Sequence, residues 1–194
     1  MKKLLSSTLL VSIILMTLAL QSCFFVAGAA AGAAAVAVVY DHRKLEKILM
    51  DNKITNTAVD KIKADPNFKE SHIEISCFNQ VVLLTGQTPT PELRQEAEDI
   101  VHAVPNVTRI YNQITIKAPT SPMTRASDSW ITTKIKTQLL ATKGMQSGTI
   151  KVVTENGTVY LMGIVSKEQA DIAATIASQV AGVQRVMKIF QYSN

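Results

Sequence analysis

The stretch TIKVVTENGTVYLMG, Thr149–Gly163, predicts a β-hairpin. Residues that favour strands alternate with polar residues on both sides of Asn156-Gly157. Asn-Gly between two such runs is the strongest short sequence signal for a hairpin turn. This hairpin therefore fixes one strand pairing, from which the neighbouring elements can be placed.

The region around this hairpin occurs twice in the chain. When the sequence is shifted by 77 residues, identical and similar residues align over most of its second half. The aligned pairs include Asp51/Asp128, Ile54/Ile131, Asn79/Asn156, Gly86/Gly163 and, after a one-residue deletion, Arg109/Arg185. Because there are only two copies, with a period longer than that of solenoid repeats, the duplication predicts two small domains in tandem.

The boundaries follow from the repeat and from changes in composition. The sequence APTSP, residues 118–122, cannot continue a helix or a central strand, so it separates the two copies. The expected division is a leader at 1–22, a linker at 23–50, a first domain at 51–117, a second linker at 118–127 and a second domain at 128–194.

Each copy predicts the order helix, strand, strand, helix, strand. Asp51 and Asp128 are candidate N-caps of the first helix. The second helix is expected to start at Thr90-Pro91 in the first copy and at the capping box Ser166–Gln169 in the second. The last strand should return parallel after a right-handed crossover. We therefore expect an α+β fold of two αββαβ domains, each a three-stranded mixed sheet covered by two helices.

The start of the chain has the layout of an export signal. Met1–Lys3 is a short positive segment, Leu9–Leu20 is strongly apolar, and the small residue Ser22 stands directly before Cys23. Read without a break, the apolar stretch to Tyr40 is far longer than the ~20 residues that cross a bilayer. The chain is therefore expected to divide at Cys23, followed by an Ala/Gly-rich linker near the lipid surface, with a second membrane insertion of that linker as the alternative.

The sequence Leu20-Gln21-Ser22-Cys23 resembles the lipobox of bacterial lipoproteins, whose cysteine is acylated and becomes the first mature residue. The resemblance implies several acyl chains on Cys23, and two or more chains are what stable anchoring requires. Phe24, in place of the aspartate of inner-membrane retention signals, implies the periplasmic face of the outer membrane. An ordinary secretory signal with a free Cys23 is the alternative. Cys77 follows Ile73 at strand spacing and is expected in the core.

The order of elements resembles the BON domain of bacterial envelope proteins. The resemblance is carried by the glycines that close the second strand, Gly86 and Gly163, and by the Val-x-Arg-Val/Ile pattern of the last strand at Val107–Ile110 and Val183–Val186. Together with the lipobox, it places the chain among dual-BON outer-membrane lipoproteins. This resemblance implies binding of anionic phospholipid, a role in envelope integrity and cell division, and no catalysis.

The two copies differ in charge. Residues 41–117 hold ten Lys and Arg against eleven Asp and Glu, a net charge of −1, whereas residues 123–194 hold eight against four, a net charge of +4. A cation near an anionic leaflet contributes ~1 kcal/mol to membrane binding. Only the second domain, with Lys134 and Lys136 on its first helix, is therefore suited to an anionic surface.

Trp130 is the candidate membrane contact. It aligns with Lys53 of the first copy, and a core position would not accept a lysine, so Trp130 is expected to face solvent. The opposite face should be marked by Ile131, Ile135 and Leu139. An exposed tryptophan beside Thr133, Lys134 and Thr137 suits the bilayer interface. Packing of Trp130 against the other domain is the alternative.

Other classes of function find little support in the sequence. The three histidines lie about thirty residues apart without metal-like spacing, and no phosphate loop or nucleophile elbow is present. A pI of about 9.2 alone does not indicate nucleic-acid binding in an exported chain without an aromatic and basic platform. We expect no enzyme activity, no cofactor, no metal and no nucleic acid.

Two functions follow from these patterns. The first is a lipid-binding protein, anchored at Cys23, whose second domain docks on anionic phospholipid through Trp130, Thr133, Lys134 and Thr137. The alternative is an adaptor that uses an exposed sheet or Trp130 to contact a protein partner, such as an envelope assembly or division machine. The near-neutral first domain is then a spacer or a packing partner.

Overall fold

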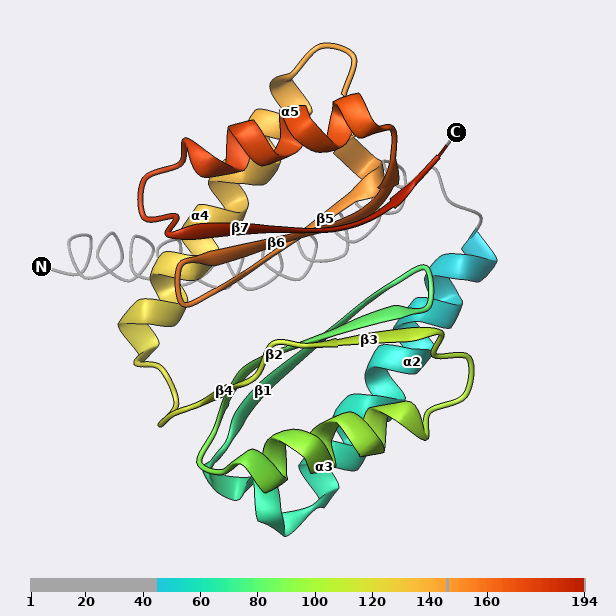
Figure 1. Ribbon diagram of the computed structural model, residues 1–194, viewed down its shortest axis with the longest axis vertical. Helices are drawn as coiled ribbons and strands as arrows, with labels where there is room; N and C mark the ends of the chain where they lie inside the picture. Colours follow the sequence, from blue (N-terminus) through green and yellow to red (C-terminus); the bar gives the residue numbers. More distant parts are fainter. Residues whose placement is uncertain (1–44, 146, 194) are drawn as a thin grey trace, which may run out of the picture. The chain divides into compact units, whose positions relative to one another are not determined.

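Each half of the chain follows the order helix, strand, strand, helix, strand (Figure 1). The computed structural model describes residues 45–145 and 147–193. The first half consists of α2 (Leu45–Ala64), the short 3-10 helix η1 (Pro66–Glu70), β1 (His72–Phe78), β2 (Val81–Thr88), α3 (Pro91–His102), β3 (Arg109–Asn112) and β4 (Thr115–Ile116). The second half consists of α4 (Pro122–Ala141), the 3-10 helix η2 (Ser147–Thr149), β5 (Ile150–Glu155), β6 (Thr158–Val165), α5 (Lys167–Ser178) and β7 (Arg185–Tyr192).

Both sheets have a central second strand. In the first, β2 pairs antiparallel with β1 and parallel with β3, and the short β4 continues the parallel pairing with β2. In the second, β6 pairs antiparallel with β5 and parallel with β7. The predicted α+β fold, with a hairpin and one parallel crossover in each of two mixed sheets, is therefore confirmed.

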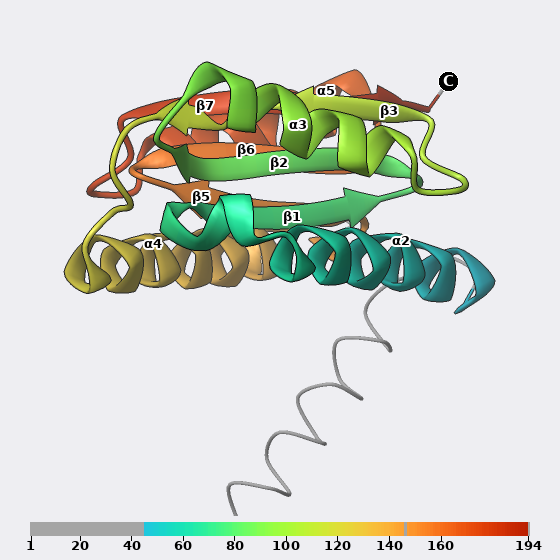
Figure 2. The ribbon, with the colours of Figure 1, turned by 90° about the horizontal axis from the view of Figure 1, so that it is seen from below.

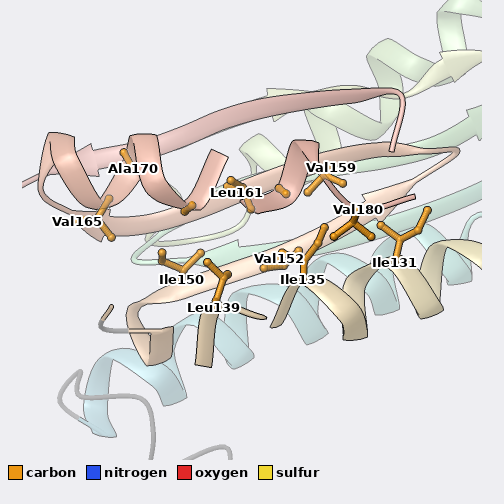
Figure 3. Close-up of a cluster of buried hydrophobic side chains, with 12 residues drawn as sticks. Ile131, Ile135, Leu139, Ile150, Val152, Val159, Leu161, Val165, Ala170 and Val180 are labelled. Atoms are coloured by element: carbon orange, nitrogen blue, oxygen red, sulfur yellow. The ribbon is translucent and has the colours of Figure 1, made fainter. Parts of the chain in front are cut away.

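Two helices cover one face of each sheet. Figure 2 shows α2 and α3 in front of the first sheet. In the second domain, Ile131, Ile135 and Leu139 of α4 point at the apolar side chains of β5 and β6 (Figure 3). The cluster is closed by the alanines of α5, Ala170, Ala173 and Ala177, which are small enough for the helix to lie close to the sheet.

The turns of the two hairpins are held by aspartates of the first helices. Asn79 and Gln80 have φ of 49° and 65°, and Asn156 and Gly157 have φ of 47° and 72°. The Asp51 carboxylate accepts hydrogen bonds from the backbone N–H groups of Asn79 (2.7 Å) and Gln80 (2.8 Å). The Asp128 carboxylate accepts the corresponding two bonds from Asn156 and Gly157, at 2.8 and 2.9 Å.

This arrangement corrects the prediction that Asp51 and Asp128 are N-caps. Helix α2 already runs from Leu45, and α4 begins at Pro122 with Ser121 as its N-cap. Both aspartates are buried in mid-helix, because their carboxylates serve the hairpin turn rather than the helix end. Residues 45–50 and 122–127, expected in linkers, are therefore helical. The predicted starts of the second helices, at Thr90 and Ser166, are confirmed.

The second face of each sheet is also covered. The described residues lie in one compact unit, and one buried cluster joins side chains from both sheets: Phe78, Val81, Leu83, Val153, Tyr160, Met162 and Ile189. Strand β2 is buried along its whole length for this reason. An exposed sheet for a protein partner, the first form of the adaptor hypothesis, is therefore wrong.

Among residues 45–145 and 147–193, no helix is both long enough and apolar enough to cross a bilayer.

Removing the carboxylate of Asp128 should destabilise the second domain. Asp128→Ala leaves two turn N–H groups without their charged acceptor, and such hydrogen bonds contribute ~1.5–3 kcal/mol each, so we expect a loss of about 3 kcal/mol in the free energy of unfolding. Urea denaturation measures this change in the free energy of unfolding. Asp171→Ala, which removes a surface carboxylate paired with Lys188, is the control and should change little. Equal effects of the two substitutions would contradict the role of Asp128.

Candidate functional site

The outward face of α4 carries exposed apolar side chains. Trp130 is 54% exposed, Met123 is 82% exposed and Leu140 is 56% exposed. The buried residues of the helix, Asp128, Ile131, Ile135 and Leu139, lie on its opposite side. The prediction that position 130 faces solvent is therefore confirmed.

Thr133 and Thr137 satisfy their hydroxyl groups within the helix. The Thr133 hydroxyl donates to the carbonyl of Ser129, and the Thr137 hydroxyl donates to the carbonyl of Thr133, both at 2.9 Å. Because burying a polar group is costly only when it lacks a partner, these threonines add little cost to moving this face out of water. The face around Trp130 is thus less polar than its composition indicates.

Lys134 stands one turn beyond Trp130, so the two side chains are neighbours on the helix surface. Both are exposed, as are Thr133 and Thr137. The structure therefore brings together the four residues predicted for lipid binding on one side of α4. Met123 and Leu140 extend this surface but were missed from the sequence, because Met123 precedes the repeat and Leu140 stands next to the core residue Leu139.

The inner side of α4 fixes the helix in place. Besides the Asp128 bonds to the hairpin, the hydroxyls of Thr132 and Thr154 lie 2.7 Å apart in a hydrogen bond between α4 and β5. At the N-terminus, the Ser121 hydroxyl accepts from the Thr124 N–H at 3.1 Å. These bonds attach the helix that carries Trp130 to the hairpin and to β5.

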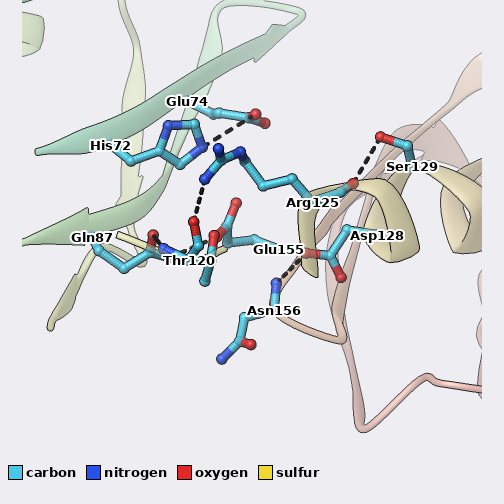
Figure 4. A network of polar contacts seen from close by, with 9 residues as sticks. All are labelled: His72, Glu74, Gln87, Thr120, Arg125, Asp128, Ser129, Glu155 and Asn156. Carbon is cyan, nitrogen blue, oxygen red and sulfur yellow. Dashed lines mark hydrogen bonds and ion pairs between the residues drawn. The ribbon is translucent and has the colours of Figure 1, made fainter. Parts of the chain in front are cut away.

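A polar cluster lies at the margin of the contact between the two sheets (Figure 4). Gln87 at the end of β2 donates its amide N–H to the Glu155 carboxylate at 2.6 Å and accepts from the Thr120 N–H at 3.0 Å. The guanidinium of Arg125 donates to the carbonyl of Thr120. This chain of bonds links both domains to the start of α4.

Burial raises the pKa values of acidic side chains near the contact between the sheets, Glu155 and Cys77 among them. Burial raises the pKa of Glu155 above its ordinary value, and the nearby carboxylates of Glu74 and Asp128 add to the effect. Burial also raises the pKa of Cys77 to about 12, and the neighbouring Asp51 carboxylate acts in the same direction. Since the thiolate is the reactive form, Cys77 is a core residue, as predicted, and not a nucleophile. Cys23 and His42 lie outside the described residues.

Replacing Glu155 should change how stability depends on pH. Between the ordinary glutamate pKa and the raised pKa, folded Glu155 keeps a proton that the unfolded chain has released, so the stability contributed by this group falls as pH rises. Glu155→Gln removes the ionisation. We expect its free energy of unfolding, relative to the wild type, to increase from about pH 5 to about pH 8 in urea denaturation. A pH-independent difference would contradict this assignment.

Comparison with known proteins agrees with this architecture. The BON domain matches residues 50–118 and 127–194. The chain is 32% identical over 177 residues to "Outer membrane lipoprotein DolP" of Haemophilus influenzae, covering 91% of each protein. It is 40% identical over 124 residues to "21 kDa hemolysin" of Actinobacillus pleuropneumoniae (64% of each), and 30% identical over 146 residues to "Osmotically-inducible protein Y" of Escherichia coli (74% of this chain, 73% of the relative). The chain therefore belongs to the BON-domain family and contains two copies of that domain.

Proposed function

We propose that this protein is a non-catalytic outer-membrane lipoprotein, anchored at Cys23, that binds anionic phospholipid through the outward face of α4 and supports envelope integrity. The observation that carries the proposal is the exposure of Trp130 on a helix whose neighbouring threonine hydroxyls are already hydrogen-bonded. The name of the relative DolP supports the outer-membrane location.

The chemistry of this face suits a membrane interface. A tryptophan ring places its apolar part among lipid tails and its N–H among head groups. Met123 and Leu140 add apolar area on the same helix. Lys134 adds a positive charge next to Trp130, and a cation near an anionic leaflet contributes ~1 kcal/mol. On this proposal, the positive charge selects anionic lipid, and the apolar side chains determine how deeply the helix inserts into the interface.

The lipid anchor makes a weak site sufficient. Acylated Cys23 holds the chain at the membrane, so contact by α4 becomes an intramolecular step with a high effective concentration. Even a low intrinsic affinity for phospholipid would then keep α4 on the surface for much of the time. On this account the lipid anchor determines which membrane the protein is attached to, and α4 determines how the second domain is oriented on that membrane.

A protein adaptor is the second candidate, now restricted to the α4 face because both faces of each sheet are covered. The observation that favours it is the exposed apolar area of Met123, Trp130 and Leu140, since such side chains also mark protein interfaces. In this case Trp130 inserts into a protein pocket, and anionic lipid is not required.

Trp130→Glu should weaken binding of the soluble fragment 43–194 to vesicles of anionic phospholipid. This fragment contains all the described cores and forms one compact unit. The substitution places a charge at the interface, so we expect a loss of affinity of about tenfold or more in vesicle co-sedimentation. Ile172→Glu, at an exposed apolar position on α5, is the control. If Trp130→Glu abolishes capture of a protein partner while vesicle binding is intact, the adaptor is the better account.

Reversing the charge of Lys134 tests the electrostatic contribution to lipid binding. Lys134→Glu removes one positive charge and adds a negative one, which corresponds to ~2 kcal/mol, or about thirtyfold weaker binding to anionic vesicles. Lys53→Glu is the matched control, because Lys53 is exposed on α2 at the position that aligns with Trp130. Binding of the wild type should also weaken as salt is raised from about 0.05 M to about 0.5 M. If Lys134→Glu and Lys53→Glu lose the same amount of vesicle affinity, the net charge of the protein alone would account for its attraction to anionic lipid.

A further inference from the structure

A histidine and two glutamates from different domains converge at the margin of the sheet contact. His72 and Glu74 alternate along β1 and therefore lie on the same face of the first sheet. Glu155 is the last residue of β5 in the second sheet. One ligand atom from each of the three side chains lies within 4.8 Å of the others, and Figure 4 shows the His72 ring directed at Glu74.

The nitrogen of His72 that enters this cluster has no hydrogen-bond partner. His72 Nε2 is inaccessible to solvent, and no donor or acceptor in the described part of the chain bonds to it. The Oε1 atom of Glu74 lies 3.7 Å from His72 Nε2, beyond hydrogen-bond distance. Buried polar atoms are normally paired, so an unpaired imidazole nitrogen beside two carboxylates indicates a missing partner.

Two carboxylates, those of Glu74 and Glu155, and one guanidinium, that of Arg125, meet at this cluster. Glu155 is only 7% exposed, and its carboxylate accepts a hydrogen bond from the neutral amide of Gln87. Arg125 lies beside the His72 ring in Figure 4 and donates a hydrogen bond to the neutral carbonyl of Thr120, so its positive charge offsets part of the negative charge here. A cation bound between Glu74 and Glu155 would reduce the repulsion between their two carboxylates.

We propose that His72, Glu74 and Glu155 bind a single divalent transition-metal ion, with Zn²⁺ as the best match. One imidazole nitrogen and two carboxylate oxygens are common zinc ligands, and three protein ligands leave a fourth position for water. Zinc holds its ligands at ~2.0–2.2 Å, which places them ~3.4 Å apart in a tetrahedron. The Glu74 side chain is 52% exposed and therefore free to make the small movement required.

Metal binding at this place would join the two domains. Two ligands come from β1 and the third from β5, so the ion would bridge the sheets beside their apolar contact. Gln87, which bonds Glu155, would orient that ligand, as groups behind metal ligands usually do. The expectation of no metal rested on the spacing of histidines and on the lack of a zinc motif, and neither pattern contains information on a histidine and glutamates from separate strands.

Isothermal titration calorimetry tests the site. The full-length protein is kept in detergent micelles, without lipid vesicles, and is titrated with Zn²⁺. We expect one saturable site, at least tenfold weaker in His72→Ala, Glu74→Gln and Glu155→Gln. Cobalt as the probe should give the visible absorption of a four-coordinate ion, lost in the same variants. Because metal binds only the folded state of the bridge, Zn²⁺ should also raise the Tm of the wild type.

His102→Ala is the matched control, because His102 is exposed at the end of α3. It should bind Zn²⁺ as the wild type does. Glu74→Gln changes an exposed side chain, so its result does not depend on refolding of the core. The proposal is overturned if the wild type shows no saturable binding below about 0.1 mM Zn²⁺, or if binding is equally strong in His72→Ala and His102→Ala.

Discussion

The bond between a mid-helix aspartate and a hairpin turn determines how each domain is built. Asp128 on α4 accepts both N–H groups of the Asn156-Gly157 turn, and Asp51 does the same for the first hairpin. The carboxylate must point at the sheet, which sets the rotation of the helix about its axis. Trp130 follows Asp128 by two residues, or ~200° around the helix, and must therefore point away from the sheet. The interaction that holds the fold also exposes the candidate lipid contact.

Two-sided burial of the sheets explains where the charged residues gather. The contact between the sheets is apolar at its centre, with Leu83 and Met162 almost fully buried. Polar residues on the same faces are confined to its margin, where Gln87, Glu155 and His72 meet. Groups at such a margin lose most of their water without entering the core. Hydrogen bonds and opposite charges there are consequently stronger than at an open surface.

The sequence predicted the features that depend on local chemistry and on the repeat. The Asn-Gly turn, the order of the elements and the outward position of Trp130 followed from residue types and from alignment of the two copies. The role of Asp51 and Asp128 could not be predicted in this way. An aspartate can cap a helix or bond to a turn 28 residues away, and the sequence alone does not distinguish the two. Burial of both aspartates in mid-helix fits only the bond to the turn. The cluster of His72, Glu74 and Glu155 depends on packing of one sheet on the other, which no local pattern contains.

Helix α4 connects the two surfaces proposed here. Its outward side carries Trp130 and Lys134, whereas Arg125 and Asp128 on its other side adjoin the polar cluster between the sheets. The helix is bonded to the hairpin at Asp128 and to β5 at Thr132, so it moves with the second domain as one body. A metal bridge from β1 to β5 would therefore fix the angle between α4 and the first domain. Through that angle, the first domain would determine how the second lies on a membrane, without contacting lipid itself.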